Sequence, residues 1–277
     1  MNKTVSIIFI IILSIITLLL TAFFINILKD SNNFNFSFNI SSNYSKKLLE
    51  KKEFDYLEDI DIESDTADIF IEESTNDKII IKLYSDNSND YYIKEQNNKI
   101  NVKLLTDNKS SLFIKKQNKI IVNIPKDYSK KINMKLTTGD VKVETFEYLN
   151  LDIINTTGDV KIEKIDTLDV ELETGDIKID KVDDIYAKCT TGDVKINKVN
   201  NKIKLSLITG DVKINNADIL KDSYIKLKTG DVKIESLKGA YIETENNIGD
   251  VKVKQKDRKS ETVIKIENNI GDIEVNN

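Results

Sequence analysis

Hydrophobic and polar residues alternate over short stretches from about residue 60 to the end of the chain. Residues 158–162, with the sequence Gly-Asp-Val-Lys-Ile, show the commonest form, in which apolar side chains occupy every second position after a glycine-aspartate pair. The same alternation precedes the pair, at Leu151 and Ile153. Successive side chains of a β-strand point to opposite faces, so this period of two predicts strands with one buried face. Each glycine-aspartate pair therefore joins two short strands.

Eight such pairs divide residues 132–277 into units of 17 to 22 residues. A unit with two short strands cannot bury its apolar face alone, so neighbouring units must stack to form a continuous core. We therefore predict an all-β fold, a single-stacked parallel β-solenoid that resembles a β-helix. Glycine suits the turns because it adopts positive φ without strain. The predicted turn glycines are Gly139, Gly158, Gly175, Gly192, Gly210, Gly230, Gly249 and Gly271.

A less regular region precedes the repeats. Residues 61–126 contain alternating stretches without the regular spacing, and residues 67–72 match the repeat with Ala67 in place of glycine. Ile60 and Ile62 stand seven and five residues before Ala67, as apolar residues do before the turn glycines. We interpret this as a degenerate opening coil followed by a sheet. Residues 54–131 are thus predicted to form an N-terminal β cap on the solenoid of residues 132–277.

The first 30 residues have a different character. No charged residue occurs between Val5 and Leu28, and about 20 apolar residues suffice to span a bilayer as a helix. We expect a transmembrane helix over residues 5–28, a cytoplasmic stub over residues 1–4 and a stalk over residues 29–53. The positive charge before the helix places the C-terminal domain outside the cell membrane. A cleaved signal peptide is the competing interpretation.

Composition excludes several kinds of chemistry. The chain has no histidine and one cysteine, Cys189, which rules out intramolecular disulfides, imidazole or thiolate zinc sites and histidine-dependent nucleophilic catalysis. A net charge of -5 gives no basic field for nucleic acid. Cys189 stands three residues before Gly192, at a position that is leucine in four other units, and is expected to be a buried small hydrophobe. We expect no cofactor and no enzymatic activity.

The aspartates of the turns are the only candidates for a metal site. In register they would form a ladder of carboxylates that calcium could bind, but there is one aspartate per coil with a lysine beside it. Closure of the turn and solubility explain them more simply. Glycoside cleavage by paired carboxylates is a further alternative, although no pair stands out from the repeat. The candidate metal ligands are Asp140, Asp159, Asp176, Asp193, Asp211 and Asp231.

A binding surface is expected where the repeat fails. These places are the cap over residues 61–126, the loop from Lys254 to Lys259, which carries four basic residues, and the last two turns. In those turns Ile248 and Ile270 replace the threonine that precedes the other six glycines.

The repeat resembles the bacterial putative-adhesin family, a domain of unknown function of the DUF4097 type. The resemblance rests on the strand Val-Asn-Ile-Pro at residues 122–125, followed by Thr-Thr-Gly-Asp-Val at residues 137–141 and 156–160. It covers residues 54–277 and implies an adhesin or a binding or scaffold module of the cell envelope, without catalysis. Some relatives are linked to envelope stress, which implies the alternative of a regulatory module that senses or restrains a membrane partner. Expected partners are the bilayer, an envelope polymer or protein, and a second copy.

Overall fold

The computed structural model describes residues 47–55, 58–86, 90–106, 118–254 and 260–276. The chain divides into two compact units, Met1–Tyr44 and Ser45–Asn277, and the first lies outside the described residues. The predicted transmembrane helix, the stub and most of the predicted stalk therefore lie outside them as well. No helix in the described part of the chain is long and apolar enough to cross a membrane.

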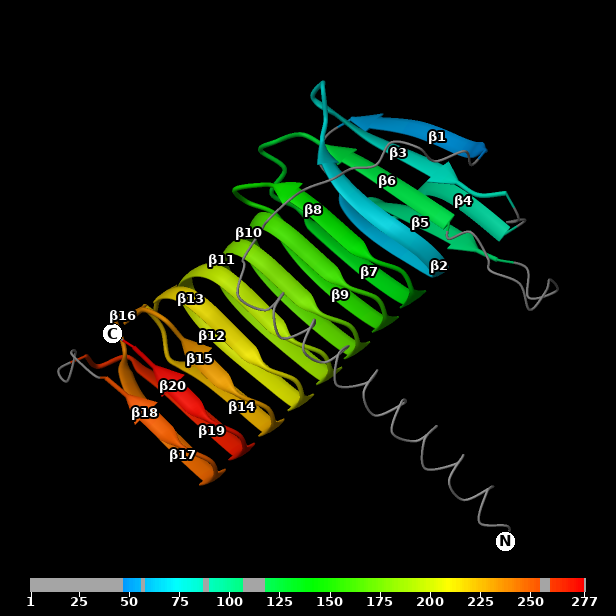
Figure 1. Ribbon diagram of the computed structural model, residues 1–277. Helices are drawn as coiled ribbons and strands as arrows, with labels where there is room; N and C mark the ends of the chain where they lie inside the picture. The colour runs from blue at the N-terminus through cyan, green and yellow to red at the C-terminus, as the bar shows by residue number, and fades with distance from the viewer. Residues whose placement is uncertain (1–46, 56–57, 87–89, 107–117, 255–259, 277) are drawn as a thin grey trace, which may run out of the picture. The chain divides into compact units, whose positions relative to one another are not determined.

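The repeats form stacked layers, each with one strand before the glycine-aspartate turn and one after it (Figure 1). Three long strands bend and contribute to two successive layers. The strands of this region are β7 (Lys131–Thr138), β8 (Val141–Thr145), β9 (Asn150–Thr157), β10 (Val160–Thr174), β11 (Ile177–Thr191), β12 (Val194–Thr209), β13 (Val212–Asp218), β14 (Ser223–Thr229), β15 (Val232–Ile234), β16 (Leu237–Lys238), β17 (Tyr241–Ile248), β18 (Val251–Val253), β19 (Val263–Ile270) and β20 (Ile273–Val275).

Equivalent strands of neighbouring layers pair in parallel and in register. Leu168 of β10, for example, faces Ile185 of β11, and Ile185 faces Ile203 of β12. All three side chains are fully buried, because every second residue of both strands in each layer points into the space that the layer encloses. The structure confirms the prediction of an all-β, mostly parallel, solenoid-like stack.

Layers do not follow chain order at the C-terminal end. Strand β19 pairs with β14 on one side and with β17 on the other, and β20 lies in the same way between β15 and β18. The layer of Gly271, red in Figure 1, is therefore inserted between the layers of Gly230 and Gly249. The layer of β17 and β18 ends the stack although it is not the last in the sequence.

Antiparallel strands close the opposite end. The strands here are β1 (Leu48–Asp55), β2 (Asp59–Glu73), β3 (Lys78–Tyr84), β4 (Asp90–Glu95), β5 (Lys99–Leu105) and β6 (Asn118–Ile124). Strand β2 pairs in parallel with β7 and β8 on one side and with β5 and β6 on the other. Strands β3 and β4 then pair antiparallel with β6 and β5, and β1 with β3.

The opening layer differs from the others at its corner. Ala67 takes the place of the turn glycine, and its φ is not positive, so β2 continues through the corner as one strand of 15 residues. Ala67 is fully buried and its carbonyl lies under Gly139 of the next layer. The outer strands bury Ile79, Ile81 and Ile93 completely, and the core therefore has an apolar lid at this end.

Candidate binding surfaces

The turn aspartates form a ladder of hydrogen bonds between layers. Oδ1 of Asp159, for example, accepts the backbone N–H of Asp176 at 2.9 Å, and Oδ1 of Asp176 accepts that of Asp193 at the same distance. Asp68 of the opening layer accepts the N–H of Asp140 in the same way. The ladder continues through Asp140, Asp193, Asp211, Asp231 and Asp272, and ends at Asp250. Each carboxylate thus bonds the next layer, whereas the sequence suggested a bond within its own turn.

In this arrangement the aspartates hold adjacent layers together. One oxygen of each candidate metal ligand from Asp140 to Asp231 is engaged by an amide. In the described part of the chain, no group of three or more histidine, cysteine, aspartate or glutamate side chains could hold a metal ion. Burial, together with the charges of Asp193 and Asp231 in the adjacent layers, raises the pKa of Asp211 despite the hydrogen bond that it accepts.

Cys189 lies inside the stack. Its Sγ is 3.7 Å from the carbonyl oxygen of Gly175 and 3.9 Å from that of Gly192, and 3% of the residue is exposed. Burial raises the pKa of the thiol to about 11, with a smaller contribution from Asp176. The nucleophilic thiolate is therefore disfavoured at neutral pH.

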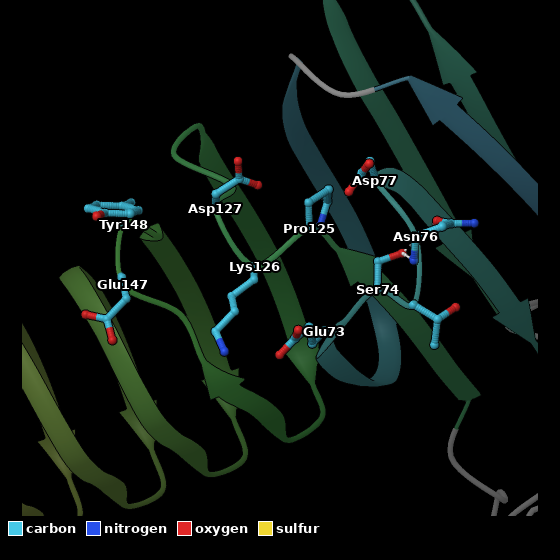
Figure 2. Close-up of a pocket in the computed structure, with 10 residues that line it drawn as sticks. Glu73, Ser74, Asn76, Asp77, Pro125, Lys126, Asp127, Glu147 and Tyr148 are labelled. Carbon is cyan, nitrogen blue, oxygen red and sulfur yellow. Dashed lines mark hydrogen bonds between the residues drawn. The ribbon is translucent and has the colours of Figure 1, made fainter.

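Three loops at the capped end enclose a shallow cleft of about 440 Å³ (Figure 2). They are the β2–β3 loop with Asp77, preceded by Glu73 at the end of β2, the β6–β7 loop with Lys126, and the β8–β9 loop with Glu147 and Tyr148. Figure 2 shows the carboxylates on both walls, with the side chain of Lys126 extending between them. Loop segments form most of this cleft, and its rim is acidic.

The outer face of the strands that precede the turns carries a second and larger feature. Three hollows of about 490, 350 and 430 Å³ lie on this face, and each shares residues with the next. Ile154 lines the first and second, and Ser206 and Ile208 line the second and third. We call the combined feature the long groove. From β5 it crosses ten neighbouring strands, β5, β2, β7, β9, β10, β11, β12, β14, β19 and β17, or roughly 40 Å at about 4.8 Å per strand. Tyr92 of β4 also lines the first hollow.

Charged side chains along the long groove neutralise one another. In the first hollow burial acts to raise the pKa of Asp61, but the hydrogen bonds that it accepts from Asn133 Nδ2 at 2.6 Å and Lys99 Nζ at 3.0 Å outweigh burial, and the pKa is lowered. In the second hollow Lys188 Nζ lies 2.5 Å from Glu171 Oε1. Both of these carboxylates thus have a lysine partner on a neighbouring strand.

The third hollow contains a denser network. Glu267 Oε1 lies 2.6 Å from Lys265 Nζ, while Tyr224 Oη donates to Glu267 Oε2 at 2.5 Å. These contacts lower the pKa of Glu267 to about 2, and burial with the bond to Glu267 raises the pKa of Tyr224 to about 12. The carboxylate therefore stays charged and the phenol neutral across the physiological range.

Two apolar side chains stand among these charges. Ile154 and Ile208 point outward from β9 and β12, and each is 49% exposed. Outward positions of the repeat otherwise carry polar or charged residues, so these two form apolar points on the floor of the long groove. The sequence contains a signal for them, since an isoleucine occupies a polar position of the period-two pattern in each case.

Buried asparagines lie beneath the second and third hollows. Asn155 and Asn268 occupy the inward position three residues before the turn glycine, where four other layers have leucine. The Nδ2 of each donates to a glycine carbonyl of an adjacent layer at 2.9 Å. The Oδ1 atoms have no hydrogen-bond partner among the described residues.

The structure describes only some of the places where the repeat fails. Residues 255–259 of the predicted basic loop lie outside the described residues. Ile248 and Ile270 are 63% and 44% exposed at the corner of the last layers. The sequence singled out these isoleucines and the cap, which supplies Asp61, Tyr92 and Lys99 to the first hollow. It did not indicate the rest of the long groove, because most of the charged residues there belong to outward positions, where composition varies from layer to layer.

Comparison with known proteins agrees with the fold. A model of the family described as Toastrack DUF4097 matches residues 57–276. A solved structure of a putative adhesin from Bacteroides fragilis is 18% identical, with a TM-score of 0.52 over 84% of this chain and 98% of that chain. A putative lipid binding protein from Parabacteroides distasonis is 12% identical, with a TM-score of 0.38 over 80% and 96% of the two chains. No curated protein matches the chain.

Proposed function

We propose, from the premise that the chain belongs to the Toastrack DUF4097 family, that it is a non-catalytic, adhesin-like module that holds an extended envelope polymer in the long groove. The family match establishes the resemblance that the Thr-Thr-Gly-Asp-Val units indicated. As part of the same proposal, a helix between Val5 and Leu28 anchors the chain in the cell membrane and leaves the stack outside. Its partners are then the bilayer and a polymer of the envelope.

The continuity of the three hollows carries this proposal. A compact ligand would need one enclosed pocket, whereas an open groove of roughly 40 Å on one regular face matches a ligand that repeats along its length. Parallel strands repeat the same backbone geometry at each layer, so successive units of a polymer meet similar surroundings. The groove therefore suits an extended chain.

The chemistry of the groove suits a polymer that is neutral or carries both signs of charge. The ion pairs between Lys188 and Glu171 and between Lys265 and Glu267 leave little net charge on the face. Apolar contact is available at Ile154 and Ile208, with hydrogen-bonding groups on either side. Apolar surface flanked by a few polar groups is typical of sites that bind by contact area. A glycan strand of the wall fits this description.

Binding without catalysis agrees with the roles that the carboxylates already have. The turn aspartates hold adjacent layers together, and the groove carboxylates of Asp61, Glu171 and Glu267 are bonded to cationic side chains. A general acid requires a carboxyl whose pKa is raised towards neutrality, and the pKa values of Asp61 and Glu267 are lowered.

Co-sedimentation of the full-length protein with purified wall sacculi tests the proposal. A glutamate at each apolar point, Ile154→Glu with Ile208→Glu, should weaken binding at least tenfold. The matched control is Leu220→Glu, which changes a residue that is 65% exposed and lies outside the groove. Equal binding of the double variant and the wild type, or no binding of the wild type, would reject the groove as the site.

The alternative function expected from the family is regulation of envelope stress through a membrane partner. The two functions separate in cells that carry the groove variant at its normal level. Loss of surface attachment with unchanged induction of stress genes supports the adhesin-like function. Altered induction with unchanged attachment supports the regulatory one.

A further inference from the structure

The two ends of the stack are finished differently. At the end formed by β1 to β6, antiparallel strands cover the last parallel layer and bury Ile79, Ile81 and Ile93 completely. At the other end, β17 pairs with β19 and β18 with β20, and neither has a second partner among the described strands. Repeat proteins normally require a capping unit at each end, because an uncapped end exposes core. We call the outer side of β17 and β18 the open end.

Core positions are exposed at the open end. Val251 is two residues after its turn glycine, and its side chain points inward, yet it is 45% exposed. The equivalent side chains of the other layers are 0–1% exposed, and they are Val141, Val160, Ile177, Val194, Val212, Val232 and Ile273. Ile248 adds apolar surface at the adjoining corner, where it is 63% exposed. No described residue therefore covers the core at this end.

The turn of the last layer also has unused hydrogen-bonding groups. In the layer beneath it, the N–H of Gly271 donates to Ile248 O and the N–H of Ile273 donates to Asp250 O, each at 2.9 Å. The same pair of bonds links the other turns of the stack. Gly249 and Val251 occupy these two donor positions in the last layer, and their N–H groups have no acceptor among the described residues. An edge with unpaired backbone groups is a template for another strand.

Among the described residues, the carboxylate of Asp250 also lacks the hydrogen-bond donor that the other carboxylates of the ladder have. Asp250 donates its own N–H to Oδ1 of Asp272 at 2.8 Å, as every aspartate of the ladder does with its neighbour. Its carboxylate occupies the position that accepts an N–H from the next layer, and no described residue supplies that N–H. The last turn therefore offers two donors and one acceptor in the arrangement that binds a further turn.

Charge indicates what kind of strand fits. The outward side chains of β17 include Glu243 and Glu245, and the side chain of Glu245 is 67% exposed, with Lys265 Nζ 3.8 Å away on the side of β19. An added strand would place a side chain opposite Glu245 on its free side. Opposite charges on neighbouring strands stabilise a sheet and like charges destabilise it. A strand with lysine at this position is thus favoured.

We propose that the open end binds an extended, lysine-bearing segment of another polypeptide, which adds one parallel layer to the stack. The backbone of the added segment accepts hydrogen bonds from the N–H groups of Gly249 and Val251 and donates one to the carboxylate of Asp250. Its apolar side chains cover Val251. A second copy joined end to end is disfavoured, since a two-fold axis would bring two sets of glutamates together. The partner is therefore a strand donor of different charge, in a β-augmentation complex.

A peptide that copies residues 223–236 is a suitable probe. In the stack this segment forms β14, its turn and β15, and covers β19 and β20 in parallel register. Lys226 Nζ lies 3.3 Å from Glu267 Oε2 there, and Glu245 occupies the same register position as Glu267. The fluorescently labelled peptide should bind the full-length protein saturably, as measured by anisotropy. Val251→Glu should weaken binding at least tenfold, and Leu220→Glu should leave it unchanged.

A charge exchange distinguishes a specific complex from loss of folding. Glu245→Lys should weaken binding of the lysine peptide and strengthen binding of a peptide with glutamate in place of Lys226. Sedimentation of the protein alone should show no end-to-end dimer. The proposal is overturned if the wild type does not bind the peptide, if Val251→Glu binds it equally, or if the exchange has no effect. A dimer that Val251→Glu dissociates would assign the open end to a second copy instead, and would also overturn it.

Discussion

Oδ1 of Asp176 accepts the backbone N–H of Asp193 at 2.9 Å, and this bond joins two residues that are 17 positions apart in the sequence. The carboxylate thus closes a contact between layers. Replacing Asp176 with alanine leaves the N–H of Asp193 without its acceptor, which should lower the free energy of unfolding by about 1–2 kcal/mol. Asp176→Asn, which keeps an acceptor oxygen, should cost less. Urea unfolding measures both, and a change within experimental error for Asp176→Ala would contradict a structural role.

The turn glycine beside this ladder admits no side chain. Gly192 has a φ of 145°, and an added Cβ would lie 1.9 Å from the carbonyl oxygen of Gly175. Because the obstacle is backbone of the adjacent layer, neither layer can move without breaking its own pairing. Gly192→Ala should therefore lower the free energy of unfolding by more than about 4 kcal/mol, in the range that marks severe core disruption. Thr191→Ala, at the exposed neighbouring position, is the control. A native-like unfolding midpoint for Gly192→Ala would disprove the close approach.

The aspartate ladder and the close packing of the turn glycines both arise from a part of the fold that the sequence specifies. The spacing of glycine-aspartate pairs predicts stacked turns, and the alternation around Leu151 and Ile153 predicts which side chains are buried. Both are local properties that repeat, so a single sequence contains them many times. The solenoid-like core could be predicted for this reason.

The order of the last layers could not be predicted in this way. The turns of Gly249 and Gly271 have nearly the same residues around them, and both could stack on the turn of Gly230. The order of the two layers depends on how their side chains pack against the neighbouring layers. In the structure the layer of Gly271 lies between the layers of Gly230 and Gly249. The open end and the exposure of Val251 follow from that order, and the long groove depends on which variable outward residues become neighbours.

Ser223 illustrates a deviation that the structure explains. It stands seven residues before Gly230, at a position that is isoleucine or leucine in most layers. Its hydroxyl accepts the N–H of Ile203 at 3.0 Å and donates to Lys221 O at 2.9 Å. The serine therefore bonds backbone groups where the chain enters β14, a role that the period-two pattern does not indicate.

Asn155 provides a test of how a polar residue is tolerated in the core. Its Nδ2 bonds the carbonyl of Gly139, but its Oδ1 has no partner among the described residues, and leucines occupy the same position in both adjacent layers, at Leu136 and Leu172. Asn155→Leu removes the unpaired oxygen and should raise the free energy of unfolding by about 1 kcal/mol. The reverse change, Leu172→Asn, should lower it by about 1–3 kcal/mol. Destabilisation by Asn155→Leu would mean that the bond to Gly139 outweighs the unpaired oxygen.

Glu267 should make the stability of the stack depend on acid pH. Its hydrogen bond with Lys265, followed by that with Tyr224, lowers its pKa from an ordinary value near 4.5 to about 2. A carboxyl whose pKa is lower in the folded state stabilises that state above the unfolded pKa, and this stabilisation is lost as the pH falls through the folded pKa. The contribution of Glu267 is therefore complete above about pH 5 and decreases between about pH 4.5 and 2.

Glu267→Gln removes the titrating group and keeps the shape of the side chain. The difference in free energy of unfolding between wild type and variant should be constant from pH 5 to 8 and should shrink as the pH is lowered towards 2. Glu261→Gln, on the segment before β19, is the control and should leave the pH profile of the wild type intact. A constant difference between wild type and Glu267→Gln down to pH 2 would show that the lysine and tyrosine contacts do not hold the carboxylate in its charged form.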